Sequence, residues 1–229
     1  MNARKMSFHS NSNIGLFAYV NEKFCLIGNV ITEEQKKEIE ETLEVPVYEI
    51  LIAGTPLIGI FVNGNEDKII IPSITKKEEL EKLDELQIEY QIVDSKYTAL
   101  GNNILIGNNQ AFVNQNLEKE AIKQIEDFLK IKLHNIDLGE LDTLGSIGVI
   151  HNDTGVIGEF IGQNKLNNLN KISDIKFSLG TINQGSDYIK SGIFKNSKGF
   201  VIGEMTSGVE IINIEQELFI GKPIHFSKN

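Results

Sequence analysis

The stretch that decides the fold is residues 99–113, ALGNNILIGNNQAFV. Gly101 is followed by an apolar run, then by a polar turn of glycine and asparagine, and then by a second apolar run. This order of features predicts a β-hairpin. The same order recurs at four other places, namely around Gly15, around Gly59, around Gly145 and in residues 188–202.

These copies recur at a nearly constant period. In the last copy Lys190 stands where the others have glycine, and positions 15, 59, 101, 145 and 190 are separated by 44, 42, 44 and 45 residues. Units of about 44 residues therefore account for nearly all of the 229 residues, which indicates one repetitive architecture. We predict a single domain of five repeats, at approximately residues 1–50, 51–93, 94–136, 137–180 and 181–229.

Each unit carries a hairpin, a helix and an outgoing strand. The first strand of the hairpin is predicted at residues 16–18 in unit one and at residues 57–62 in unit two. Capping boxes predict where three helices begin: Thr32 with Gln35, Thr75 with Glu78, and Ser207 with Glu210. Asn116 is the predicted N-cap in unit three. Unit four is rich in asparagine at residues 162–171, where we expect a short or irregular helix.

No unit of this kind buries its apolar face alone, so neighbouring units must stack. Both terminal units have strongly apolar strands and lack the polar caps of an open solenoid. The sequence therefore predicts an α/β fold closed into a ring: a five-fold pseudosymmetric α/β propeller with helices outside and strands inside.

Composition narrows the range of functions. Hydrophobic residues make up 41% of the chain and charged residues 24%, which suits a compact protein with a sizeable core. No apolar run approaches the roughly 20 residues that span a bilayer, and residues 1–7 lack the apolar core of a secretory signal. We therefore expect a cytoplasmic protein without a membrane partner. The formal net charge of −10 predicts little direct binding to RNA, because proteins that bind phosphate backbones are usually basic.

Metal and cofactor sites are not indicated. The single cysteine, Cys25, excludes an internal disulfide framework and an all-cysteine metal site. The four histidines have no ligand-like spacing, and neither common glycine pattern of a phosphate-binding loop is present. The sequence therefore predicts no metal, no cofactor and no nucleotide chemistry.

Several short motifs carry a family resemblance through their order and spacing. They are Ile52-Ala53-Gly54 with Leu57-Ile58-Gly59, Ala99-Leu100-Gly101-Asn102, Leu144-Gly145-Ser146, Thr181-Ile182-Asn183 with Gly185-Ser186, Asn196 with Lys198-Gly199, and Thr206 with Glu210. Over essentially the whole chain the sequence resembles the translation initiation factor 6 family, and the archaeal branch more than the eukaryotic one. It departs from the family at Gln184, where an arginine is usual, and at Lys190, which replaces a small residue.

The resemblance implies a fold, a function and partners. The fold is the pentein, and the function is to bind the joining face of the large ribosomal subunit and block the small subunit, with roles in large-subunit biogenesis and translation initiation. One flat end of a monomeric ring would dock on a basic ribosomal protein beside the sarcin–ricin loop, which suits an acidic ring. A release GTPase and its adaptor are further expected partners.

The resemblance also selects candidate ribosome-binding residues. They are Asn102, Gly101, Asn11, Asn13, Ile58, Leu144, Asn183, Gly185 and Ser186. A structural explanation stands beside this one: the repeated glycines serve backbone needs, and Asn102 and Asn183 satisfy turn amides.

Two other function classes remain open. The pentein fold also contains guanidine-modifying enzymes, which use a nucleophilic cysteine with a histidine and acidic partners. Only Cys25 could serve, and it lies in the first unit between Phe24 and Leu26, whereas those enzymes carry the nucleophile late in the chain. The third class is an interaction ring with another partner.

Overall fold

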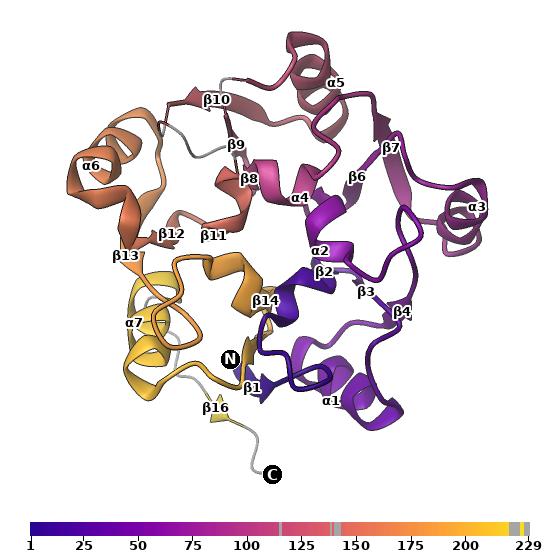
Figure 1. Cartoon of the computed structure of the whole chain (residues 1–229), viewed down its shortest axis with the longest axis horizontal. Helices are drawn as coiled ribbons and strands as arrows, with labels where there is room; N and C mark the ends of the chain where they lie inside the picture. The colour runs from indigo at the N-terminus through magenta and orange to yellow at the C-terminus, as the bar shows by residue number, and fades with distance from the viewer. Residues whose placement is uncertain (115, 138, 140–142, 220–224, 227–229) are drawn as a thin grey trace.

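Five small β-sheets surround a central axis, and helices cover the outside of the ring (Figure 1). The computed structural model describes residues 1–114, 116–137, 139, 143–219 and 225–226. The predicted α/β propeller, with helices outside and strands inside, is confirmed. Within the described residues, no helix has the length and apolar character needed to cross a membrane.

Four units share one topology, in which an antiparallel hairpin is followed by a helix and by a strand parallel to the second hairpin strand. Unit one has β2 (Ala18–Val20), β3 (Cys25–Ile27), α1 (Glu33–Leu43) and β4 (Val47–Glu49). Unit two has β5 (Asn63–Gly64), β6 (Lys68–Pro72), α3 (Lys77–Glu85) and β7 (Glu89–Val93). Unit three has β8 (Ile104–Ile106), β9 (Gln110–Asn114), α5 (Lys119–Leu129) and β10 (Lys132–Ile136). Unit four has β11 (Gly148–His151), β12 (Thr154–Gly158), the 3₁₀ turn η3 (Glu159–Ile161), α6 (Gly162–Ile172) and β13 (Lys176–Gly180).

The fifth sheet joins the two ends of the chain. Its hairpin, β14 (Ile193–Lys195) and β15 (Gly199–Gly203), is followed by α7 (Gly208–Leu218), but its third strand is β1 (Asn2–Met6), parallel to β15. The short β16 (His225–Phe226) pairs with the other edge of β1. Residues 2–6 therefore belong to unit one in sequence and to the fifth sheet in space, and their pairing closes the ring.

One predicted strand is displaced and another is wrong. Of the strand expected at 16–18, Leu16 belongs to the 3₁₀ turn η1 (Ile14–Leu16) and Ala18 begins β2. The helical turn α2 (Ile58–Phe61) replaces the strand expected at 57–62. Corresponding turns are α4 (Leu100–Asn103), η2 (Leu144–Ser146) and η4 (Ile189–Gly192). Each unit therefore enters its hairpin through one helical turn near the axis, and a short apolar run alone does not distinguish such a turn from a strand.

Helix starts agree with the sequence in two of four cases. The boxes Thr32–Gln35 and Ser207–Glu210 are confirmed by their reciprocal hydrogen bonds. The box Thr75–Glu78 is wrong, because the Thr75 hydroxyl donates to Pro72 O and Glu79 instead accepts from Lys76 N at 2.8 Å. Asn116 is also not the N-cap of α5, a position that Glu118 occupies.

The expected irregular helix of unit four is instead a regular 11-residue helix, α6. Leu166 and Leu169 are buried on its inner side. The Asn170 side chain accepts from Phe177 N at 2.7 Å and donates to Phe177 O at 3.0 Å. These contacts with β13 stabilise a segment of low helix propensity, a tertiary effect that overrides local preference.

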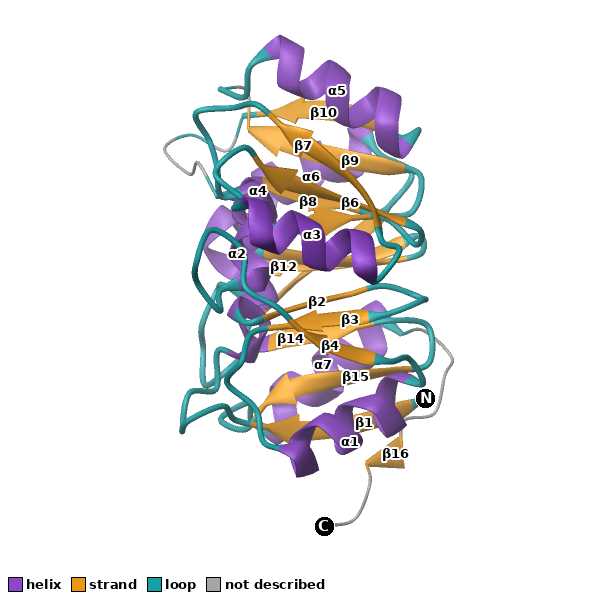
Figure 2. Ribbon diagram, turned by 90° about the vertical axis from the view of Figure 1, so that its right-hand side faces the viewer, coloured by secondary structure: helices purple, strands orange, loops and turns teal. Residues whose placement is uncertain are grey.

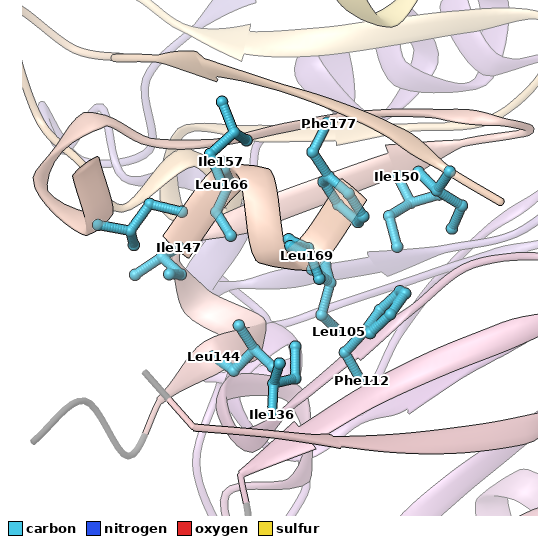
Figure 3. Packing of buried hydrophobic residues seen from close by; sticks show 12 residues of the cluster. Leu105, Phe112, Ile136, Leu144, Ile147, Ile150, Ile157, Leu166, Leu169 and Phe177 are labelled. Atoms are coloured by element: carbon cyan, nitrogen blue, oxygen red, sulfur yellow. The ribbon is translucent and has the colours of Figure 1, made fainter. Parts of the chain in front are cut away.

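Hydrophobic clusters fill the space between neighbouring sheets. In Figure 3, Leu105 and Phe112 of unit three lie beside Ile150 and Phe177 of unit four, and the rings of Phe112 and Phe177 meet edge to face at 5.6 Å. Because each such cluster draws on two units, the units stabilise one another around the ring.

Hydrogen bonds at the hairpin turns also connect neighbouring units. Side chains of one unit donate to the last carbonyl groups of the next unit's helix, where backbone acceptors lack intrahelical partners. The pairs are Asn65 Nδ2 with Leu129 O at 3.0 Å, Thr154 Oγ1 with Leu218 O at 2.9 Å and Asn196 Nδ2 with Leu43 O at 2.8 Å.

Candidate functional site

The two ends of the ring differ in structure. One end carries the five helical turns and the loops that lead into them, and we call it the loop end; the other carries the hairpin turns, and we call it the hairpin end. Figure 2 shows the loop end on the left, where α2 and α4 lie. The five turns contact one another in a closed circle, in the order η1, α2, α4, η2 and η4. They form a rigid base for the loops of this end.

Glycines make this circle possible. A Cβ atom built on Gly15 would lie 1.9 Å from Lys190 O, and one on Gly59 would lie 1.9 Å from Gly15 O. Corresponding distances are 2.1 Å from Gly101 to Gly59 O and 2.5 Å from Gly145 to Gly101 O. Gly101 is thus explained by the packing of the backbone, because neighbouring turns approach too closely for a side chain at this position.

Lys190 occupies the fifth glycine position and sends its side chain across the ring. Its Nζ donates to Gly101 O, two units away, at 2.7 Å. Lys190 borders two cavities, one of about 430 Å³ that opens at the loop end and one of about 140 Å³ toward the hairpin end. The side chain therefore lies between the two cavities. Burial lowers the pKa of its ammonium group to about 7.

A buried carboxylate holds the loop that precedes η4. Glu210 accepts hydrogen bonds from Ser207 N at 2.7 Å, Gly185 N at 2.8 Å and Thr181 Oγ1 at 3.0 Å. Burial alone would raise the pKa of Glu210, but these hydrogen bonds hold it below its usual value. In unit two Glu79 plays the same part, accepting from Ala53 N at 2.8 Å and Gly54 N at 2.7 Å. These two loops of the loop end are therefore preorganised.

Asn183 connects units five and one. Its Nδ2 donates to Ser12 O at 2.8 Å, and its Oδ1 accepts from Thr206 Oγ1 at 3.0 Å. Its backbone is left-handed, with a φ of 51°. The neighbouring Asn13 accepts from Ser191 Oγ at 3.1 Å, and Asn11 Oδ1 accepts from Asn13 N at 2.9 Å. These hydrogen bonds stabilise the loop end, so the three asparagines Asn183, Asn13 and Asn11 have a structural role whether or not they contact a partner.

The structure brings several of the sequence-selected residues together. Asn102, Asn13 and Ser186 line the larger cavity, and Gly185 is exposed beside Ser186. Ile58 and Leu144 are a correction, because their side chains are 0% and 1% exposed and pack in the hydrophobic core. Their motifs form two of the helical turns, α2 and η2. Because the two side chains are buried, they are not available to a partner.

Two further residues of this surface were not predicted from the sequence. Tyr188 is 51% exposed and lines the larger cavity, and Lys190 lines both cavities. Lys190 carried a signal, since it departs from the repeated glycine. Asn102 also lines the larger cavity, and its side-chain amide has no hydrogen-bond partner within the described part of the chain.

Comparison with known proteins identifies the family. A model described as the eIF-6 family matches residues 3–217. The chain belongs to the eIF-6 family. Translation initiation factor 6 of Staphylothermus marinus is 34% identical over 218 residues, which cover 93% of this chain and 96% of that protein. Translation initiation factor 6 of Pyrococcus horikoshii is 30% identical over 224 residues, covering 95% and 99% of the two chains.

Solved structures of pentein enzymes share the fold of this eIF-6 family member. A Pseudomonas aeruginosa DDAH in complex with citrulline superposes with a TM-score of 0.55 at 11% identity, covering 99% of this chain and 91% of that one. A dimethylarginine dimethylaminohydrolase adduct with S-methyl-L-thiocitrulline gives 0.51 at 10% identity over the same shares. At this identity the likeness shows the fold alone.

The one cysteine of this eIF-6 family member lies in the core. Cys25 is 0% exposed on β3, and burial, with the nearby charge of Glu40, raises the pKa of its thiol. A thiol in such surroundings is inert, because the thiolate is the nucleophile. Within the described residues, no group of three or more His, Cys, Asp or Glu side chains could hold a metal ion.

Proposed function

We propose that the chain binds the joining face of the large ribosomal subunit through its loop end and prevents the small subunit from associating by its bulk. The observation that carries this proposal is family membership over residues 3–217, that is, over the entire ring. The function would serve large-subunit biogenesis and translation initiation in the cytoplasm. A monomer would suffice, since one ring provides both the docking end and the obstructing bulk.

Three features support docking by the loop end. Two of its loops, in units two and five, are held by the buried carboxylates Glu79 and Glu210, so these loops need little ordering on binding. Polar groups of this end, including the Asn102 amide and the Ser186 hydroxyl, are gathered around one cavity. The net charge of −10 favours a basic protein patch, such as a ribosomal protein beside the sarcin–ricin loop, over bare RNA. We further propose that a GTPase with an adaptor releases the ring.

Cosedimentation with separated ribosomal subunits tests this function. We expect the purified protein to sediment with large subunits and not with small ones, and to lower the yield of joined ribosomes when both are mixed. Free ribosomal RNA in excess should not displace it, because a protein surface dominates the contact. Equal binding to both subunits, or displacement by RNA, would contradict the proposal.

We also propose that the chain is not an enzyme, and Cys25 provides the test. The thiol should react with a thiol reagent at least roughly a hundredfold more slowly in the folded protein than in guanidinium, because labelling requires unfolding. The variant Cys25→Ser should bind large subunits as the wild type does. Rapid labelling of the folded protein, or turnover of a guanidine substrate that Cys25→Ser abolishes, would favour the enzyme hypothesis.

A further inference from the structure

Lys190 is the one charged residue in the five helical turns. It stands at the position where the other four units have glycine. It is enclosed by protein, yet it retains accessible surface because it faces the two axial cavities. An ammonium group in such a position is removed from bulk water without being packed into an apolar core. The ammonium group is therefore accessible from the cavities that it borders.

The hydrogen bonds around Lys190 are incomplete. An ammonium group has three donors, and within the described residues Gly101 O is the one hydrogen-bond acceptor of Nζ. The amide of Asn102, on the same cavity, also lacks a partner among the described residues. A cation and an amide therefore present unused hydrogen-bond donors to the same cavity.

The larger cavity is lined by a cation and, among the described residues, by no carboxylate. The described residues that line the larger cavity include no aspartate or glutamate, and its polar groups are hydroxyls and amides, including those of Thr143, Ser146 and Ser186. An enclosed ammonium group without a counter-charge is unfavourable, and an anion beside it would remove that penalty. The volume of about 430 Å³ lies in the range of small-molecule pockets.

We propose that the larger axial cavity binds a small tetrahedral oxyanion, either inorganic phosphate or the phosphate group of a small monoester, through the Lys190 ammonium and the Asn102 amide. Charge-assisted hydrogen bonds from an ammonium group to phosphate are among the stronger ones in proteins. The site goes beyond ribosome docking and is measured on the isolated protein, so its failure leaves the docking proposal untouched.

The site should respond to pH through Lys190. Burial lowers the pKa of this ammonium group to about 7, so the group loses its proton as pH rises through that value, and affinity for an anion falls with it. The titratable groups that line the cavities around it are Tyr188 on the loop side and Tyr19, Glu22, Glu66 and Lys195 on the hairpin side. A bound anion favours the protonated form and raises the pKa of Lys190.

Calorimetric titration with sulfate, whose charge is constant between pH 6 and pH 8.5, tests the site. We expect binding at pH 6 that is at least roughly tenfold weaker at pH 8.5, where few copies of Lys190 are protonated. Lys190→Gln should weaken binding at pH 6 at least roughly tenfold. Lys37→Gln, the same charge change on the exposed outside of α1, should leave it unchanged.

Two phosphate compounds distinguish the source of the anion. Tighter binding of ribose 5-phosphate than of inorganic phosphate, lost in Lys190→Gln, would indicate a monoester, and equal binding would indicate the free anion. Sulfate binding that is absent, independent of pH or unchanged in Lys190→Gln would overturn the proposal. If Lys190→Gln does not fold, NMR of ¹⁵N-lysine-labelled wild type decides instead: sulfate must raise the pKa of one amine that titrates near 7, and no shift refutes the site.

Discussion

Gly59→Ala is expected to lower the free energy of unfolding by at least about 3 kcal/mol, which corresponds to a fall in Tm of about 6–12 °C for a chain of this length. The new Cβ would lie 1.9 Å from Gly15 O and 2.7 Å from Ala18 O. Both atoms belong to the backbone of the neighbouring unit, so no flexible side chain can move aside. The strain must open the circle of turns.

The matched control is Gly208→Ala, at the first residue of α7. Nothing lies within 4 Å of a Cβ built there, and its φ is not in the left-handed region. Alanine has the higher helix propensity, so this change should be neutral or stabilising by up to about 1 kcal/mol. Urea unfolding followed by circular dichroism compares the two, and equal stability of both variants would show that the turns do not meet closely.

The sequence predicted the ring because its signals are periodic and local. Gly15, Gly59, Gly101 and Gly145 recur at the repeat length, and the boxes at Thr32 and Ser207 mark helix starts within four residues of chain. The reason why these positions require glycine could not be predicted from the sequence, because it is a contact between units. Each glycine faces a carbonyl oxygen of a neighbouring turn.

Features that depend on distant partners were missed. The strand β1 is defined by its pairing with β15, nearly 200 positions later, and its sequence has no clear alternation of its own. The helix α6 relies on contacts of Asn170 with β13. The family motifs that contain Ile58 and Leu144 helped to predict the fold. They did not show which side chains reach the surface, and both of these are buried.

Asn102 is the residue of the loop end on which the docking proposal depends most. At the matching step the other units carry Leu16, Ile60, Ser146 and Ser191, whereas a purely structural asparagine should recur with the backbone. In the structure its side chain is half-buried, lines the larger cavity and has no hydrogen-bond partner within the described residues. Its amide is thus free for a contact outside the ring.

Asn102→Arg should therefore leave Tm near that of the wild type and weaken binding to large subunits at least roughly tenfold, a loss of about 1.4 kcal/mol. The arginine adds bulk at a close contact and opposes a basic partner. Asn102→Ala should be milder, about 1 kcal/mol, because it removes one hydrogen bond. Cosedimentation across a range of subunit concentrations gives the affinities.

Asn109→Arg provides the matched control, since it makes the same charge change in an exposed turn at the hairpin end. It should bind large subunits as the wild type does, because that end faces away from the proposed contact. Equal weakening in both variants would indicate a general effect of net charge instead of a local contact. Unfolding of Asn102→Arg would show that Asn102 is structural, and a folded variant with undiminished affinity would place the docking face elsewhere on the ring.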